Sequence, residues 1–143
     1  MEKACAETMP SSAAQRWRYW LPVVAYTSLI FYLSSLPHPE DTLPNFLFEQ
    51  LGDKLLHAVE YAVLAFLCYR AFRHAAGPRA ASNALLLAIG AASLFGMTDE
   101  VHQAFVPSRE SSWSDWIADT AGAVVGAAGL HCFVKRGTKH DIS

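Results

Sequence analysis

Four apolar runs, separated by polar segments, dominate the pattern of the chain. The middles of the first and third runs lack the alternation of polar and apolar faces that a soluble helical bundle would show. Each run is about 17 to 20 residues long, close to the length of helix that crosses a hydrocarbon core of about 30 Å. The pattern therefore predicts an all-α, polytopic membrane protein with four transmembrane helices in a bundle. These helices are expected at residues 20–36, 53–72, 80–103 and 114–134, and the apolar part of the third ends at Met97.

The segments outside the bundle are polar or only partly apolar. Residues 1–15 are small and polar and are expected to form a disordered cytoplasmic N-terminus, and residues 136–143 a cytoplasmic tail. The membrane domain is then expected over residues 16–135. No cleavage site typical of a secretory signal closely follows the first apolar run, so this run is expected to be retained. The apolar residues of segment 38–52 recur at helical spacing, which is typical of a short interfacial helix.

The distribution of lysine and arginine predicts the orientation. With a cytoplasmic N-terminus and four spans, nine of the eleven Lys and Arg residues lie on the cytoplasmic side. Only Lys54 and Arg109 lie on the outer side. Because cytoplasmic loops carry the excess of positive charge, both termini are expected in the cytoplasm. The same topology brings the end of the first span, the start of the second, the end of the third and the start of the fourth to the outer face.

Composition narrows the function classes. The 143 residues suit one domain, and 52% of them are hydrophobic while 17% are charged. The formal net charge is −2, so no basic excess indicates a nucleic-acid partner. The three cysteines are far apart and show no C-x-x-C spacing, which excludes the usual patterns of a disulfide framework or a cysteine zinc site.

Polar residues interrupt the second apolar run at its outer end. Asp53, His57 and Glu60 follow one another at i, i+4 and i+7, so they share one stripe of the helix, with Tyr61 at its edge. Glu60 would lie about 10 Å below Asp53 along the helix axis. A carboxylate at that depth is costly unless it is paired or hydrated. For Asp53 a simpler explanation is a membrane-edge anion in the first helical turn.

The third run ends in a second polar group. Asp99, His102 and Gln103 share one face, and Glu100 points about 100° away. Glu100 therefore also fits a solvated residue or a partner of one of the two outer cations, and His102 fits either a ligand or an interfacial filler. In the loop that follows, Arg109 could bind a phosphate through two hydrogen bonds.

The fourth run begins with Asp115 and Asp119 at i and i+4. Gly122 and Gly126 continue the same stripe and form a small-x-x-x-small pattern, which lets another membrane helix approach closely. Such packing would bring both aspartates against the second and third spans. Asp115, in a first helical turn, also fits a membrane-edge anion.

These residues predict one polar pocket that opens to the outer face. Crowded carboxylates cannot all ionise without cost, which favours acid–base chemistry, and together with histidine they could hold a divalent cation. Candidate catalytic residues are Asp53, His57, Glu60, Asp99, Asp115 and Asp119. Candidate substrate-binding residues are Lys54, Tyr61, Glu100, Gln103 and Arg109. Candidate metal ligands are His57, Asp99, His102 and Asp119. No strong catalytic motif is present, so the sequence leaves open whether the protein is an enzyme.

The segments DKLLHAVEY (53–61), TDEVHQAFVPSR (98–109) and SDWIADTAGAVVG (114–126) resemble the VanZ-like family of small bacterial membrane proteins. The resemblance covers most of residues 20–134. The positions that match the family pattern are Asp53, Lys54, His57, Tyr61, Asp99, Glu100, Gln103, Pro107, Arg109, Asp115 and Gly122. Two positions depart from it, since Ser108 replaces a usual glycine and Asp119 stands where asparagine is common. The serine makes a left-handed turn there less expected.

The resemblance implies a protein of the bacterial cytoplasmic membrane, in a family whose namesake lowers susceptibility to the glycopeptide teicoplanin. It supplies no biochemical mechanism. We expect a cell-envelope protein that binds, or modifies, an anionic lipid or lipid-linked precursor. The alternatives are a small transporter or flippase that couples to ions or protons, and a non-catalytic structural protein. The transporter is less favoured because the cytoplasmic halves of the spans show little polar lining. The oligomeric state is left open.

Overall fold

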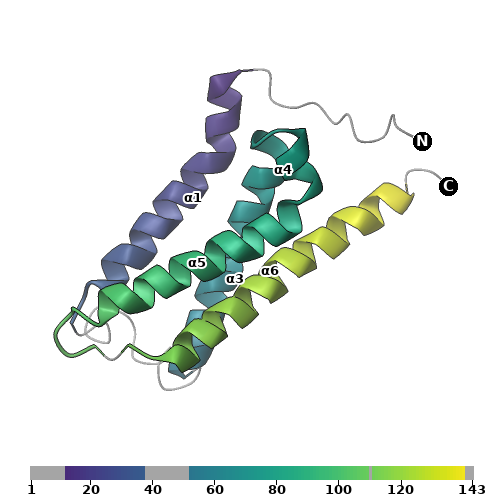
Figure 1. The fold of residues 1–143 in the computed structure, drawn as a ribbon. Coiled ribbons are helices and arrows are strands. Elements are labelled where there is room, and N and C mark those ends of the chain that lie inside the picture. The colour runs from purple at the N-terminus through teal and green to yellow at the C-terminus, as the bar shows by residue number, and fades with distance from the viewer. Residues whose placement is uncertain (1–11, 38–51, 110, 141–143) are drawn as a thin grey trace.

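The computed structural model describes residues 12–37, 52–109 and 111–140, and this part of the chain is helical and without strands. The predicted all-α class is thus confirmed. The interfacial helix predicted within residues 38–52 lies outside the described residues, apart from Gly52. The described helices, drawn in Figure 1, are α1 (Ala13–Ser34), α3 (Asp53–Ala75), α4 (Pro78–Ser82), α5 (Ala84–Gln103) and α6 (Trp113–His140).

The helix boundaries differ from the prediction at the turn between the second and third apolar runs. The run expected to form one helix from residue 80 is divided into α4 and α5, which meet at Asn83. Gly77 has a φ of 94°, which glycine adopts without steric strain, and it reverses the chain after α3. At the C-terminal end, α6 continues to His140, beyond the expected end at 134.

Within the described residues, three helices are long and apolar enough to cross a membrane: α3, α5 and α6. With 22 residues α1 has sufficient length. It is not among the three helices that meet the hydropathy criterion, and its first eight residues include two arginines. The structure therefore supports a membrane protein with three clear candidate spans, and a fourth span at α1 rests on length alone.

Helices α3 and α6 run parallel and in register. Three side-chain contacts join residues that are separated by a nearly constant 61 or 62 positions along the chain. A constant separation is what two parallel helices in register require. The pairs are Lys54 with Asp115, His57 with Asp119, and Tyr69 with His131.

The directions of α1 and α5 bring their C-terminal ends to the end of the bundle where α3 and α6 begin. The guanidinium Nε of Arg16, near the start of α1, donates to the carbonyl of Ala75 at the end of α3 (2.9 Å). The hydroxyl of Ser35, just after α1, lies 3.0 Å from Nε2 of His102 at the end of α5. The ends of α1 and α5 and the starts of α3 and α6 therefore lie together, and the opposite end holds α4 and the last turns of α6 (Figure 1).

Small residues bring the helices close together. The buried face of α5 is a stripe of alanines that ends in Gly96, and α6 contributes two fully buried alanines. At Gly122 and Gly126 an added Cβ would overlap the carbonyl oxygens of Ala58 and Ala62 on α3. The two backbones are therefore in direct contact over successive turns, as the small-residue pattern predicted.

We predict that Gly126→Ala destabilises the protein, because the new methyl group overlaps the α3 backbone. The expected loss is about 1–3 kcal/mol in the free energy of unfolding, as for other overpacked sites. Gly129→Ala is the matched control, since no atom lies within 4 Å of the Cβ added there. Thermal unfolding in detergent measures the difference, and equal melting temperatures for the two variants would contradict the close contact.

Candidate functional site

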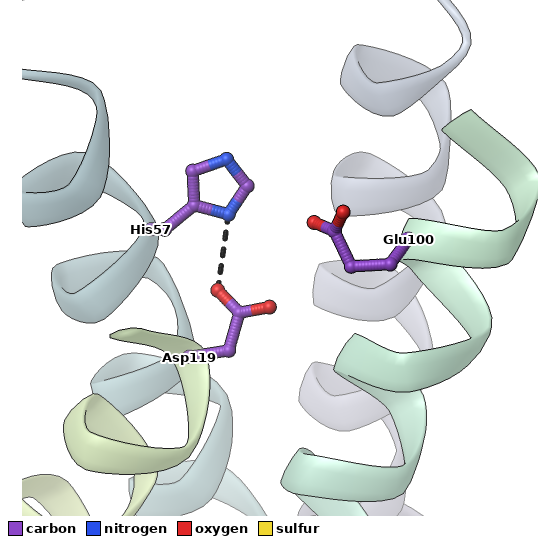
Figure 2. A group of neighbouring side chains, drawn as sticks. All are labelled: His57, Glu100 and Asp119. Atoms are coloured by element: carbon purple, nitrogen blue, oxygen red, sulfur yellow. Dashed lines mark hydrogen bonds and ion pairs between the residues drawn. The ribbon is translucent and has the colours of Figure 1, made fainter. Parts of the chain in front are cut away.

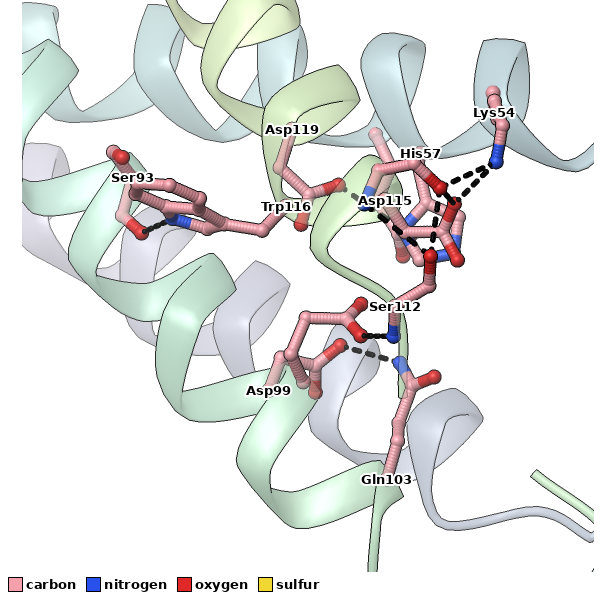
Figure 3. A network of polar contacts seen from close by, with 12 residues as sticks. Lys54, His57, Ser93, Asp99, Gln103, Ser112, Asp115, Trp116 and Asp119 are labelled. Atoms are coloured by element: carbon pink, nitrogen blue, oxygen red, sulfur yellow. Dashed lines mark hydrogen bonds and ion pairs between the residues drawn. The ribbon is translucent and has the colours of Figure 1, made fainter. Parts of the chain in front are cut away.

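Buried polar side chains from α3, α5 and α6 converge at the end of the bundle where α3 and α6 begin. Figure 3 labels five of them, His57, Asp99, Gln103, Asp115 and Asp119, and draws their polar contacts. Each is less than a tenth exposed, although each is a residue type that is rarely buried without a partner. We call this group the polar cluster; its members are His57, Asp99, Glu100, Gln103, Asp115 and Asp119.

The centre of the polar cluster is a contact between α3 and α6. Nδ1 of His57 lies 3.0 Å from Oδ1 of Asp119, and Asp119 is fully buried. Gly96 on α5 makes room for this aspartate, since a Cβ at Gly96 would lie 2.9 Å from Oδ2 of Asp119 and 3.1 Å from the Tyr61 ring. The missing side chain at Gly96 therefore lets a carboxylate and a tyrosine ring lie against α5.

Glu100 completes the centre from the α5 side. It is buried, and its Oε2 accepts a hydrogen bond from the backbone N–H of Ser112 (2.7 Å), which ties the loop before α6 to α5. Its carboxylate faces the same gap as the side chains of His57 and Asp119 (Figure 2). One ligand atom from each of these three residues lies within 4.8 Å of the others. The interpretation of Glu100 as a solvated surface residue is therefore excluded.

Two further contacts surround this centre. Asp99 accepts a hydrogen bond from the side-chain amide of Gln103, one turn later on α5 (2.9 Å). Lys54 lies at the rim, with its side chain 64% exposed and its Nζ 2.9 Å from Oδ1 of Asp115. The ammonium also donates to the hydroxyl of Ser114 (2.8 Å). The buried centre is therefore acidic, whereas its rim carries a cation.

Four buried polar atoms of this region have no hydrogen-bond partner within the described part of the chain. Leaving such an atom unpaired typically costs about 1–3 kcal/mol, so each one calls for a partner such as water, an ion or a ligand. Four of the five such atoms in the described part of the chain belong to this region, which distinguishes it from the rest of the bundle. They are Tyr61 Oη, Asp99 Oδ1, Glu100 Oε1 and Asp119 Oδ2.

Not every predicted site residue joins the polar cluster. The ring of His102 stacks on that of Phe31 at 4.5 Å and contacts Ser35, so it faces α1. The structure thus places this candidate metal ligand apart from the other histidine. The side chain of Asp53 lies outside the described residues, although its backbone begins α3. Glu60 is partly exposed, and its carboxylate lies within electrostatic reach of Asp119 and Arg109.

The VanZ/LLP1 family model matches residues 8–134, a range that contains all of the polar cluster. The chain belongs to the VanZ/LLP1 family. Among curated proteins and solved structures, the comparison found no match. The resemblance inferred from the sequence is therefore confirmed, and together with the three apolar helices it supports a VanZ-like membrane protein.

The loop before α6 of this VanZ/LLP1 protein contains a left-handed residue. Ser108 has a φ of 65°, in the region that glycine adopts most readily. The left-handed turn is therefore present, although serine replaces the glycine that is usual at this position in the family pattern. It lies directly before Arg109, which is partly buried, and so fixes the backbone direction at this cation.

A small cavity adjoins the polar cluster on the side of α5 and α6. Its volume is about 100 Å³, and Glu100 forms part of its wall. The remaining wall is largely apolar and includes two tryptophans whose rings meet edge to face at 6.0 Å. The lining residues are Met97, Glu100, Val101, Ser111, Ser112, Trp113 and Trp116. The cavity therefore connects a buried carboxylate with an apolar surface of the bundle.

Sequence reasoning missed several polar contacts deeper in the bundle of the VanZ/LLP1 protein. The hydroxyl of Tyr69 lies 2.9 Å from Nδ1 of His131, and Ser93 contacts Thr120 at 2.7 Å. The indole N–H of Trp116 donates to the carbonyl of Ser93 (3.0 Å). Isolated polar residues in apolar runs gave no periodic signal. Tyr69 and His131 could be paired only from the 62-residue offset that His57 and Asp119 also show.

We predict a larger coupling energy for the buried pair than for the rim pair in double-mutant cycles. His57→Gln with Asp119→Asn should give about 1–2 kcal/mol, the upper range for polar contacts between membrane helices. Lys54→Met with Asp115→Asn should give about 0.5 kcal/mol or less, because the ammonium is largely exposed. Equilibrium unfolding in mixed micelles measures both cycles. Equal coupling energies would show that burial of His57 and Asp119 does not strengthen their contact.

Proposed function

We propose that this VanZ/LLP1 protein is a cell-envelope membrane protein whose polar cluster binds the anionic headgroup of a lipid or a lipid-linked envelope precursor. The observation that carries the proposal is that Glu100 belongs both to the polar cluster and to the apolar cavity beside it. A molecule with a charged head and an apolar tail could contact both the polar cluster and the apolar cavity. Modification of that ligand by acid–base chemistry is a further step of the same proposal.

The electrostatics of the rim support an anionic headgroup. Lys54 and Arg109 lie at the same end of the bundle as the polar cluster, and Arg109 follows the left-handed turn at Ser108. Arginine binds phosphate through two parallel hydrogen bonds, while lysine acts as a point charge. A phosphate at the rim would contact these cations, and its apolar tail would extend along the cavity wall formed by Val101 and Trp113.

The proposed topology has four spans, cytoplasmic termini and the polar cluster at the outer face. It rests on the positive-inside rule and on the arrangement of helix ends, since α1 begins at the end of the bundle opposite to the polar cluster. Ligand access would then be from the outer leaflet.

A structural role is the second candidate, because the side chains at His57 and Lys54 both join α3 to α6. Helix-joining alone does not account for unpartnered oxygens on Glu100 and Asp119, nor for the cavity beside Glu100. A transporter has no specific support from the described contacts.

We predict that a cysteine at Ser108, in a variant whose native cysteines are replaced by serine, reacts with a membrane-impermeant maleimide in intact cells. Ser108 is exposed at the end that carries the polar cluster. Ser82→Cys in the same background is the matched control, since Ser82 is exposed on α4 at the opposite end. It should react only after the cells are broken. Labelling of Ser82→Cys alone in intact cells would reverse the proposed orientation.

We predict that Val101→Trp lowers lipid binding at least about fivefold, because the indole fills the cavity beside Glu100 without changing a charge. Leu94→Trp is the matched control. Leu94 is exposed on the same helix two turns earlier and does not line the cavity. Native mass spectrometry of the purified protein measures binding of phosphatidylglycerol and of a polyprenyl phosphate, with phosphatidylcholine as the neutral comparison.

The two anionic lipids distinguish the possible ligands, since phosphatidylglycerol represents a membrane phospholipid and the polyprenyl phosphate a lipid-linked precursor. Preferential binding of either anionic lipid over phosphatidylcholine, lost in Val101→Trp and kept in Leu94→Trp, supports the proposal. Equal binding of the neutral lipid contradicts an anionic site. Wild-type lipid binding in Val101→Trp would show that the cavity is not the binding place of the tail.

A further inference from the structure

We propose that His57, Glu100 and Asp119 form a binding site for a divalent transition-metal cation, and that this cation holds the headgroup phosphate. The three residues come from three different helices, α3, α5 and α6. Figure 2 shows their polar atoms around one gap, with the Glu100 carboxylate opposite the imidazole and the Asp119 carboxylate. The second half of the proposal, the contact with phosphate, rests on the proposed function; the metal site itself does not.

The geometry is close to that of a coordinated ion. One ligand atom from each residue lies within 4.8 Å of the others. A zinc-class ion takes nitrogen and oxygen ligands at about 2.0–2.2 Å, so its ligands lie between about 3 and 4.4 Å from one another. Side-chain movement of less than an ångström brings the three atoms into that range. Among the described residues, these three alone form such a group of His, Cys, Asp and Glu.

Unpaired buried atoms point to a ligand independently of this clustering. Oδ2 of Asp119 and Oε1 of Glu100 have no hydrogen-bond partner in the described part of the chain. Their residues are only 0% and 6% exposed. Each carboxylate already uses its other oxygen, toward His57 and toward the Ser112 N–H. Each therefore holds one oxygen ready for a cation, and a cation would remove the cost of leaving it unpaired.

Charge and ligand type select the class of ion. Two carboxylates and a neutral imidazole balance one divalent cation, which removes most of the repulsion between the buried acids. A site of one imidazole nitrogen with carboxylate oxygens suits zinc, manganese or ferrous iron, whereas magnesium prefers oxygen ligands only. The Asp99–Gln103 contact lies beside the site and is not needed as a ligand.

The cation would also explain how an acidic cluster binds an anion. Without it, the carboxylates of Glu100 and Asp119 would repel a phosphate that approaches from the rim. With it, the ion offers open coordination positions, since three protein ligands leave at least one for an outside oxygen. Lys54 and Arg109 would then bind the remaining phosphate oxygens.

The site is tested on full-length protein purified in detergent with no polyhistidine tag and stripped with EDTA. Elemental analysis after dialysis against Zn²⁺ or Mn²⁺, and the visible absorption of Co²⁺, report binding. We expect one equivalent per chain and weaker binding of Mg²⁺. Affinity should fall at least about tenfold in His57→Gln and in Glu100→Gln. The matched control His102→Gln should bind as the wild type, because His102 faces α1 and does not belong to the group.

Three outcomes overturn the metal site: no stoichiometric binding, equal binding of Mg²⁺ and Zn²⁺, or unchanged Co²⁺ absorption in His57→Gln. If a ligand variant does not fold, the effect of Zn²⁺ on the melting temperature of the wild-type protein tests the site instead. Zn²⁺ should raise it by several degrees with reversal by EDTA, because a ligand that binds only the folded state stabilises it. No shift overturns the site.

The role toward phosphate is tested by repeating the lipid titration on metal-loaded and stripped protein. Anionic lipid should bind about tenfold more tightly to the loaded form. Metal binding together with metal-independent lipid binding overturns the bridging role alone. Metal binding without any lipid binding overturns the proposed function and leaves the ion site standing, so the two failures are distinguishable.

Discussion

The direct backbone contact between α3 and α6 is the constraint on which the rest of the structure depends. Gly122 and Gly126 let α6 lie against the carbonyl groups of Ala58 and Ala62, and this contact fixes the offset between the two helices. With that offset fixed, the α3 side chain opposite Asp119 is His57, and the one opposite Asp115 is Lys54. The glycines therefore determine which charged groups share a buried environment, although they carry no chemistry themselves.

Much of this arrangement could be predicted from residue spacing. The apolar runs predicted the helices, and the stripe of Asp115, Asp119 and the two glycines predicted that the acidic end of α6 packs against its neighbours. Glu100 could not be placed in the same way. Helical geometry places its side chain about 100° from that of Asp99, but its surroundings depend on which helix lies on that side. Helical periodicity gives the face of a residue and not the partner that the face meets.

Tertiary contacts that the sequence does not predict also decide the positions of His102 and Ser108. His102 shares a face with Asp99, yet its ring packs on Phe31 because α1 passes there. Ser108 adopts a left-handed backbone that its side chain does not favour, because the loop is held at both ends by α5 and by the Ser112–Glu100 hydrogen bond. Tertiary contacts thus override the local preference. The family match covers the residues of the polar cluster, and the packing shows independently that these residues are buried together.

The contact at the two glycines also has a mechanical consequence. Helices whose backbones touch at successive turns cannot slide or roll past one another without collision, so the contact is expected to restrict relative motion of α3 and α6. By contrast, α5 reaches the centre through Gly96 and the long side chain of Glu100, which can change rotamer. Entry of a molecule to the buried carboxylates is therefore expected to require movement of α5 rather than separation of α3 from α6.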